Sequence, residues 1–274
     1  MNVIIMKPEI EGAQNMERVL PLSKSVFSGS AACRGCGAML GMKLMLQAID
    51  SCVIVNSTGC ISLTGKHVKV PFVSAGLNAC AVARGIQNSI AIDEKDRQEK
   101  TAVVVFAGDG ATRMNLQSLI AAKEGIIYVC YNNQGFSSLG QKELWSSLAK
   151  QVAFTASYVA TASVAFPEDF VKKLQKAKTK PGFKFIELHA PCPIEWGFDP
   201  SNTIEVSRLA VETGFWPLYE IEDHAINLSK SLTRLEPVER YFELLAFKPA
   251  EAQLKSLQHD ISKNWRLLSE GKLI

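Results

Sequence analysis

The 274-residue sequence carries a formal charge of +3 at pH 7, with 47% hydrophobic and 21% charged residues. This composition predicts a folded chain with a substantial core and excludes an intrinsically disordered one. No lysine- or arginine-rich arm is present, so we expect no binding to nucleic acid. Neither a signal-peptide pattern nor a run of 18 apolar residues is found, which predicts a cytoplasmic protein that does not span a membrane.

Apolar, strand-like segments alternate with helical patterns along the chain. We expect strands at Val53–Ser57, Ala102–Ala107, Ile126–Tyr131, Tyr158–Ser163, Lys184–Ala190 and Pro217–Ile221. We expect helices near Ala38–Ile49, Leu77–Ile90, Leu116–Glu124 and Glu168–Lys178. Strands rich in Val and Ile that alternate with helices are typical of an α/β fold, in which helices cover both faces of a mostly parallel, doubly wound sheet.

The chain divides into three parts on this pattern. Residues 1–30 are an N-terminal extension, residues 31–235 are the α/β domain, and residues 236–274 are a C-terminal helical tail. The tail is amphipathic and its helical pattern is broken at Pro249. We expect such a tail to pack against its own domain or against a partner subunit.

Two turns rich in glycine and amide side chains follow consecutive predicted strands. They are Gly108-Asp109-Gly110 and Asn132-Asn133-Gln134-Gly135. Doubly wound sheets bind ligands at the carboxyl ends of their strands. Glycines allow a phosphate to approach the backbone, and the carboxylate of Asp109 is a hard oxygen ligand of the kind Mg²⁺ prefers. The two turns therefore predict a site for a phosphate-bearing cofactor, although each turn alone is a weak signal.

Seven cysteines without a secretory signal favour reduced thiols over disulfides. Cys33 and Cys36 form a C-x-x-C pair directly before a predicted helix, which fits a redox dithiol, half of a zinc site or two ligands of a cluster. The dithiol lacks a preceding strand, and zinc would need a second C-x-x-C or a His pair. Cys52, Cys80 and Cys130 lie in apolar patterns and are expected to be buried structural residues.

Three longer segments carry a resemblance to a known family. They are ACRGCGAML, VIVNSTGCISL and HAPCPIEWGFDPSNTIEVSRLAVETGFWPLYE. Together with the Gly-Asp-Gly and Asn-Asn turns they resemble the β subunit of pyruvate and related 2-oxoacid:ferredoxin oxidoreductases, from about Ala31 to Glu220. The resemblance implies a thiamine diphosphate-binding fold for residues 31–235, and it also implies an iron–sulfur cluster in the same domain.

The resemblance also implies which residues hold each cofactor. Asp109, Asn133 and the backbone of Gly135 would bind the Mg²⁺ of thiamine diphosphate. The ligands of a [4Fe–4S] cluster would be Cys33, Cys36, Cys60 and Cys192. Further residues expected beside the cofactors are Gly37, Gly59, Asn78, Gly108, Gly110 and Ser138.

The implied reaction is oxidative decarboxylation of a 2-oxo acid to acyl-CoA and CO2, with electrons passed to ferredoxin, or the reverse. The 2-oxo acid, coenzyme A and ferredoxin would then be partners, together with an α-type subunit and further γ and δ subunits. The carboxylate that activates the pyrimidine would come from the α-type subunit, so we expect the isolated chain to be inactive. Glu187 and Glu195 offer no obvious substitute, and no catalytic residue of this chain is assigned.

Several departures from the family pattern lie where substrate and cofactor should meet. Ser138 replaces the usual Asn, and Ala38 stands where a polar residue is common. The segment from Gly110 to Asn132 is about one helical turn shorter than usual, so the helix after the first turn must be short or its exit tight. These changes favour an altered substrate preference. The alternative is a non-catalytic paralogue with a structural or regulatory role. A thiamine enzyme without redox chemistry would leave the cysteines unexplained.

Overall fold

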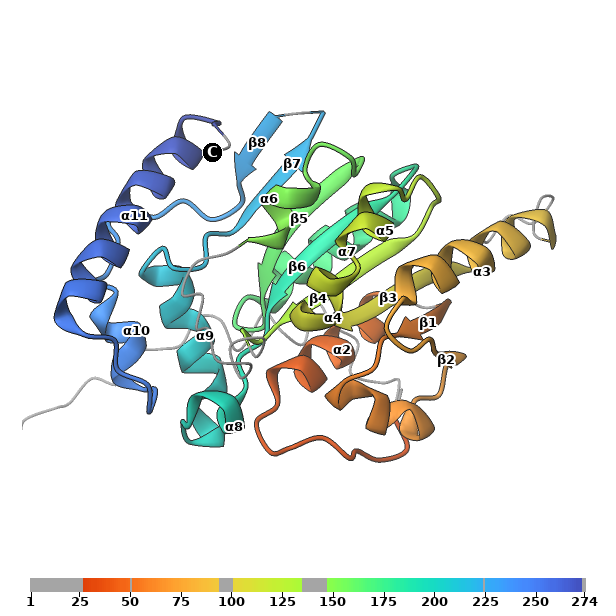
Figure 1. The fold of residues 1–274 in the computed structure, drawn as a ribbon, viewed down its shortest axis with the longest axis horizontal. Coiled ribbons are helices and arrows are strands. Elements are labelled where there is room, and N and C mark those ends of the chain that lie inside the picture. The colour runs from red at the N-terminus through yellow and green to blue at the C-terminus, as the bar shows by residue number, and fades with distance from the viewer. Residues whose placement is uncertain (1–26, 50, 94–100, 135–146, 224, 273–274) are drawn as a thin grey trace, which may run out of the picture.

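The computed structural model describes residues 27–49, 51–93, 101–134, 147–223 and 225–272. Within these residues the centre is a sheet of eight strands in the order β2-β1-β3-β4-β6-β5-β7-β8 (Figure 1). The strands are β1 (Cys52–Asn56), β2 (Phe72–Ser74), β3 (Ala102–Gly108), β4 (Ile127–Asn132), β5 (Tyr158–Ser163), β6 (Lys184–His189), β7 (Tyr219–Glu222) and β8 (Ala225–Leu228). The first six in the sheet order pair in parallel, and β7 and β8 are added in antiparallel pairings. The predicted mostly parallel α/β sheet is confirmed.

Helices cover both faces of the sheet, as expected for a doubly wound fold. They are α2 (Gly37–Ala48), α3 (Ala79–Asp93), α4 (Asp109–Met114), α5 (Leu116–Ile120), α6 (Leu148–Val152), α7 (Pro167–Thr179), α8 (Pro193–Trp196), α9 (Thr203–Glu212), α10 (Glu239–Glu243) and α11 (Glu251–Ser269). Helices α2 and α7 belong to the core on one face. Helices α3, α5 and α6 belong to the core on the other face.

Strand β3 shows why the central strands appear in the sequence as continuous apolar runs. Val104 and Phe106 face the layer of α2 and α7, whereas Val103 and Val105 face the layer of α3 and α5. All four side chains are fully buried. Successive side chains point to opposite faces of a strand, so a strand covered on both faces needs an apolar residue at every position. Each such side chain contributes about 1.5–3 kcal/mol by burial.

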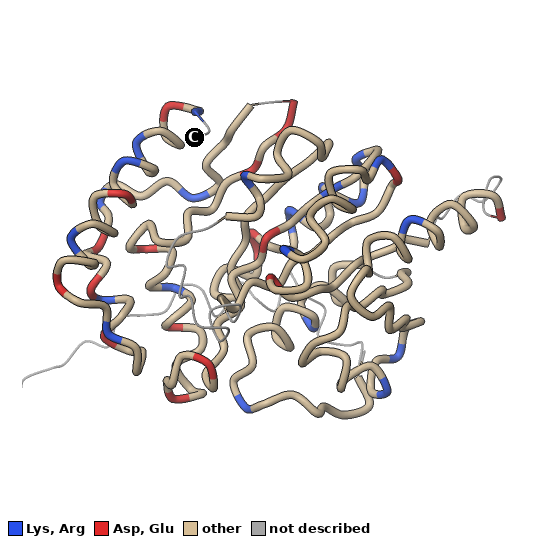
Figure 2. The backbone as a smooth tube through the Cα atoms, viewed as in Figure 1, with Lys and Arg blue, Asp and Glu red and all other residues tan. Residues whose placement is uncertain are grey.

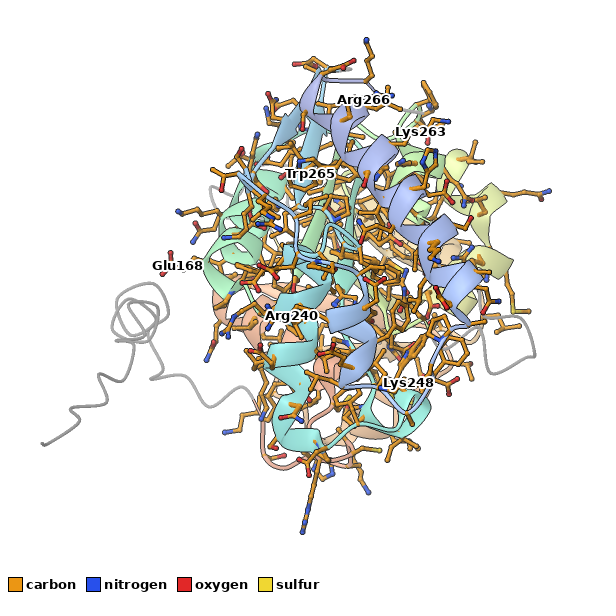
Figure 3. All side chains as sticks on the ribbon, turned by 90° about the vertical axis from the view of Figure 1, so that its left-hand side faces the viewer. Glu168, Arg240, Lys248, Lys263, Trp265 and Arg266 are labelled. Atoms are coloured by element: carbon orange, nitrogen blue, oxygen red, sulfur yellow. The ribbon has the colours of Figure 1, made fainter. Side chains whose placement is uncertain are left out.

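A third apolar cluster joins α8 and α9 to the C-terminal tail beyond the β7–β8 edge (Figure 1). It contains several aromatic residues, among them Phe215 stacked on Tyr241 with ring centroids 4.7 Å apart. In the tail, α11 buries Leu257, Ile261 and Leu268. Figure 3 looks onto α11 and labels its exposed Lys263 and Arg266. The tail therefore packs on its own domain through one apolar stripe.

Some elements differ from those expected. Five elements were not anticipated from the sequence: β2, β8, α6, α8 and α9. All of them except α9 are short. The helix expected at Leu116–Glu124 ends at Ile120, and α4 precedes it. Asn115 separates the two helices, and its Nδ2 donates to the carbonyl of Ala111 at 2.9 Å. The expected N-terminal extension falls almost entirely outside the described residues, and the domain boundaries stay a prediction.

Charged residues concentrate on the outer helices, α11 above all, while the central strands carry few (Figure 2). Lys173 on α7 is an exception, since it is 1% exposed and its Nζ donates to the carbonyl of Thr161, to Asp169 and to the hydroxyl of Ser229. No helix among the described residues is both long and apolar enough to cross a membrane.

The burial of His189 predicts a pH-dependent stability. Burial lowers the pKa of His189 to about 3, whereas an unfolded histidine titrates near pH ~6.5. Between these values the unfolded chain binds more protons, so stability falls as the pH falls through this window. We expect this residue alone to remove about 2 kcal/mol of stability at pH 5 relative to pH 8. Urea unfolding of wild type and His189→Gln at several pH values measures the free energy of unfolding against pH. We expect a steeper fall for wild type, and parallel curves for the two proteins would contradict this prediction.

Candidate functional site

Four adjacent strands end in the turns that the sequence singled out. Strands β1, β3, β4 and β6 are neighbours in the sheet and run in the same direction. Their carboxyl ends lead into 57–60, 108–110, 132–134 and 190–192 respectively. Because parallel strands end at the same edge, the glycine, amide and cysteine turns meet along one rim of the sheet.

The first turn places a buried carboxylate at this rim. β3 ends at Gly108 and α4 begins at Asp109, whose exposed fraction is 4%. The hydroxyl of Thr112 donates to the carbonyl of Gly108 at 2.7 Å, which fixes the start of α4. Gly110, also predicted to contact the cofactor, is the second residue of α4. A carboxylate on a fixed turn, next to glycine, suits a Mg²⁺ ion that also binds phosphate oxygens.

The short helix after this turn agrees with the short spacing in the sequence. α4 has 6 residues and α5 has 5. Asn115 between them donates from Nδ2 to the carbonyl of Leu77 at 2.8 Å, which holds the start of α3 against this corner. Asn78 is exposed, and its Oδ1 accepts from the backbone N–H of Ala81 at 3.2 Å, as an N-cap does. Its contact with a cofactor stays a prediction.

The second turn is held from two sides by buried side chains. Nδ2 of Asn132 donates to Glu187 on β6 at 2.8 Å, while its Oδ1 accepts from the backbone N–H of Gln134 at 2.9 Å. The indole N–H of Trp196 on α8 donates to the carbonyl of Asn133 at 2.9 Å. Burial raises the pKa of Glu187, and the hydrogen bonds that it accepts partly oppose the rise. Gly135 and Ser138 lie outside the described residues.

The C-x-x-C turn is packed directly against the Ala-Pro-Cys turn. The N–H of Gly37 donates to the carbonyl of Pro191 at 3.2 Å. A Cβ at position 37 would lie 2.7 Å from that oxygen, so only glycine allows this approach. The hydroxyl of Thr203 donates to the carbonyl of Gly35 at 2.6 Å and holds the other side of the turn. Cys36 and Cys192 each immediately precede a helix.

The thiols are close enough to affect one another electrostatically. Burial raises the pKa of Cys36, and Cys192 and Cys33 add to the rise. Burial likewise raises the pKa of Cys192, with Cys60 and Cys33 adding to it. Cys33 and Cys60 are exposed, whereas Cys36 and Cys192 are half-buried. The turns that carry Cys36 and Cys192 are in direct contact, and the turns that carry Cys60 and Cys192 follow strands of the same rim. The other three are buried structural residues, as expected: Cys52, Cys80 and Cys130.

The described residues contain no ready-made group of ligands for a metal ion. In the part of the chain that the structure describes, no three or more His, Cys, Asp or Glu side chains form the ligand set of one metal ion. The thiolates of a [4Fe–4S] cluster bind separate irons, so four spaced cysteines on turns are a suitable donor set. The Sγ of Cys36 accepts from the backbone N–H of Met39 at 3.4 Å, the kind of contact that tunes a cluster. The cluster and the Mg²⁺ stay predictions.

Tyr131 separates the cysteine turn of β1 from the Asp109 turn of β3. A Cβ at Gly59 would lie 3.0 Å from its hydroxyl, and a Cβ at Gly108 would lie 3.1 Å from its ring. The ring is 4% exposed and stacks on Phe106 with centroids 5.0 Å apart. A Cβ at either glycine would therefore crowd the ring and require it to shift. Tyr131 could not be singled out from the sequence, because a tyrosine in an apolar strand carries no distinguishing signal.

Ser57 is a further residue that sequence reasoning did not single out. It follows β1 at the rim, two residues before Gly59, and it is 1% exposed. Its hydroxyl has no hydrogen-bond partner among the described residues. A buried hydroxyl without a partner is costly, so its position at this rim is consistent with a bound polar group.

Comparisons with known proteins agree with this architecture. Residues 57–188 match the family model "Thiamine pyrophosphate enzyme, C-terminal TPP binding domain". The chain is 37% identical over 258 residues to the pyruvate synthase subunit PorB of Methanothermobacter marburgensis, covering 81% of this chain and 88% of that protein. It is 32% identical over 296 residues to the ketoisovalerate oxidoreductase subunit VorB of Pyrococcus horikoshii, covering 92% of this chain and 94% of that protein.

A solved structure shares the fold. It is a 2-oxoglutarate:ferredoxin oxidoreductase from Magnetococcus marinus, which matches with a TM-score of 0.53 and 19% identity over 90% of this chain and 89% of that chain. The parallel sheet, the Asp109 turn and the family match define the class: a thiamine pyrophosphate-binding domain. Within that class, the chain belongs to the family of β subunits of 2-oxoacid:ferredoxin oxidoreductases. The resemblance seen in the sequence is thereby confirmed.

The close approach at Gly37 makes a testable prediction. Gly37→Ala would force the C-x-x-C turn away from Pro191. We expect this overpacking to lower the free energy of unfolding by about 1–3 kcal/mol. Gly85 is a matched control, because it is an exposed glycine within α3 and a Cβ added there would meet nothing within 4 Å. Gly85→Ala should be neutral or should stabilise by up to ~1 kcal/mol through helix propensity. Urea unfolding of both variants measures the difference, and equal effects would rule out the proposed contact.

Proposed function

We propose that this chain binds thiamine diphosphate and Mg²⁺ beside Asp109 and Asn133 and a [4Fe–4S] cluster through Cys33, Cys36, Cys60 and Cys192. In complex with partner subunits it would convert a 2-oxo acid and coenzyme A to acyl-CoA and CO2, passing electrons to ferredoxin, or catalyse the reverse. The observation that supports this most directly is the meeting of both sets of turns at the ends of β1, β3, β4 and β6. The names of the relatives, pyruvate synthase and ketoisovalerate oxidoreductase, point to the same reaction class.

The residues of this chain would bind and orient the cofactor. When bound, thiamine diphosphate supplies the carbanion chemistry that a 2-oxo acid needs to lose CO2. Asp109 would hold Mg²⁺ through a carboxylate oxygen, the side chain of Asn133 through an amide oxygen, and Gly135 through its carbonyl. Gly108 and Gly110 leave the backbone open to the diphosphate. Asp109 is 4% exposed, so a cation there would interact with it more strongly than in water.

The cysteine turns provide the route for electrons in this proposal. The Cys60 turn and the Asp109 turn flank the same tyrosine ring, that of Tyr131. The Cys192 turn continues into α8, and Trp196 of α8 bonds to the carbonyl of Asn133. The cysteine segments are thus joined to both cofactor turns by buried side chains. A redox centre fixed next to an organic cofactor is what distinguishes oxidation from simple decarboxylation.

Exposed apolar side chains near the same rim support the requirement for a partner subunit. Leu77 is 52% exposed and Met114 is 64% exposed. They lie near each other, since Asn115 next to Met114 bonds to the carbonyl of Leu77. Val82 on α3, 37% exposed, extends this apolar surface. Apolar patches of this kind mark interaction surfaces, and an α-type subunit seated here would contribute the carboxylate that activates the cofactor.

Three departures favour a non-catalytic paralogue, and the structure bears on two of them. Ala38 is 4% exposed and belongs to the core cluster that also contains Leu188. A polar side chain at that position would enter an apolar core, so Ala38 is explained by packing. The short spacing after Gly110 is accommodated by the two short helices α4 and α5. The third departure, Ser138, lies outside the described residues. Thiamine content of the purified complex separates the two functions.

Two substitutions should uncouple the cofactors. In the complex purified anaerobically with its partner subunit, Cys192→Ser should lose most iron and sulfide but retain thiamine diphosphate. Asp109→Asn should lose thiamine diphosphate and retain iron. Cys52→Ala is the matched control, because Cys52 is a buried cysteine at the opposite end of β1 from the rim, and it should change neither content. Iron, sulfide and thiamine analysis provides the measurement, and full iron in the Cys192 variant would reject the cluster assignment.

The substrate can be identified with the same complex. We expect one 2-oxo acid of a panel that includes pyruvate, 2-oxoisovalerate and 2-oxoglutarate to bleach the visible cluster absorbance when coenzyme A is added. The responding acid defines the specificity. A complex that contains no thiamine diphosphate and responds to none of the acids would instead establish the structural or regulatory paralogue.

A further inference from the structure

Glu187 is a fully buried carboxylate that the proposed chemistry does not use. It lies in β6 and accepts four hydrogen bonds. Oε1 accepts from Nδ2 of Asn132 at 2.8 Å and from the N–H of Leu148 at 3.2 Å. Oε2 accepts from the hydroxyl of Ser147 at 3.0 Å and from the N–H of Ala149 at 2.8 Å. All four partners donate, so an ionised carboxylate fits the site on both oxygens.

The four donors come from two different elements. Asn132 is the last residue of β4, next to the predicted metal ligand Asn133. Ser147, Leu148 and Ala149 form the N-cap and first turn of α6. One carboxylate therefore connects the end of β4 to the start of α6. The cost of burying a charge here is several kcal/mol, and only a complete set of donors offsets it.

The geometry points to Glu187 as a positioning residue for the Asn132–Asn133 turn, holding that turn in place for Mg²⁺ and the diphosphate without touching either. This inference rests on the proposed binding of thiamine diphosphate. The side-chain amide of Asn132 has one orientation, because its Oδ1 accepts from the N–H of Gln134 and cannot also face Glu187. Its Nδ2 must then face an acceptor, and Glu187 is the acceptor present. The side chain of Asn132 thereby fixes the backbone that carries Asn133.

The orientation of Asn132 allows a test that distinguishes a positioning role of Glu187 from a contribution to stability alone. In Glu187→Gln the new amide nitrogen would face either Nδ2 of Asn132 or the donors of Ser147 and Ala149, so one pairing of donors is unavoidable. In the double variant Glu187→Gln/Asn132→Asp the carboxylate introduced at position 132 would accept from the amide nitrogen at position 187 and from the N–H of Gln134. The amide oxygen at position 187 would still accept from Ser147 and Ala149. The double variant therefore restores the connection between positions 132 and 187 with donor and acceptor exchanged, while the N–H of Leu148, which also donates to Oε1 in wild type, loses its acceptor.

The experiment measures the affinity of Mg²⁺·thiamine diphosphate for the complex after chelator treatment, by titration calorimetry, for wild type, both single variants and the double variant. We expect each single variant to weaken binding at least tenfold, and the double variant to bind more tightly than either single variant. Iron content and melting temperature are recorded for the same samples. Glu220→Gln is the matched control, because Glu220 also accepts from neighbouring side chains, Tyr158 and Lys176, but lies on the antiparallel strand β7. It should leave the affinity unchanged.

The outcomes separate this inference from the proposed function. If wild type does not bind thiamine diphosphate, the proposed function fails. If wild type binds but the Glu187→Gln variant binds equally well, or if melting temperature falls without any change in affinity, the positioning role is overturned. If Glu187→Gln does not fold, the double variant decides: a folded double variant that binds more tightly than Asn132→Asp supports the role, and a folded one that binds no better than Asn132→Asp overturns it.

Discussion

Parallel hydrogen bonding between β1, β3, β4 and β6 places four chain segments that are far apart in the sequence at a single rim. The strands supply no chemistry themselves, because most of their side chains are apolar and buried on both faces. Their register, however, determines where each turn leaves the sheet. Residues 190–192 join the turns at 57–60, 108–110 and 132–134 because β6, and not β5, lies next to β4 in the sheet. With β5 in that place, the Cys192 turn would lie one strand further from Asp109.

Close approaches of glycine residues, to a backbone at Gly37 and to an aromatic ring at Gly59 and Gly108, bring the turns together at this rim. Gly37 lies against Pro191, and Gly59 and Gly108 lie against the ring of Tyr131, at distances that a Cβ would not tolerate without movement. A few buried polar side chains then fix the turns at this spacing. The indole of Trp196 connects the cysteine turn of β6 to the end of β4. The two proposed centres, one organic and one iron-based, would have to be held by rigid turns, and this packing would provide that rigidity.

The sequence predicts the central strands well because their signal is local. Tyr158–Ser163 is found with its observed bounds, and the other central strands are displaced by one residue or so. The cysteines and Asp109 are singled out by the family resemblance, and their roles stay predictions. Glu187 and Trp196 are not found, since a lone Glu in FIELH and a Trp after a Pro-Ile-Glu turn look like surface or packing residues. Their roles depend on the adjacency of β4 and β6, which no local pattern encodes. Short elements such as α6 are missed for the same reason: Glu187 from a distant strand accepts from its first N–H groups.

Joining two elements through a buried carboxylate lowers the folding stability, because the charge must be desolvated. An apolar pair would join them without this desolvation free energy. What an apolar pair does not provide is orientation, because dispersion contacts allow a side chain such as that of Asn132 to rotate or slide. The carboxylate of Glu187 accepts only in defined directions, and its four donors lie on two separate segments. Strand β4 and helix α6 are therefore held in a fixed relation at the point where the Asn132–Asn133 turn leaves the sheet. The metal site proposed for this turn would need its ligands fixed within a fraction of an ångström, which would give a reason to retain such a charge even though it lowers the free energy of unfolding.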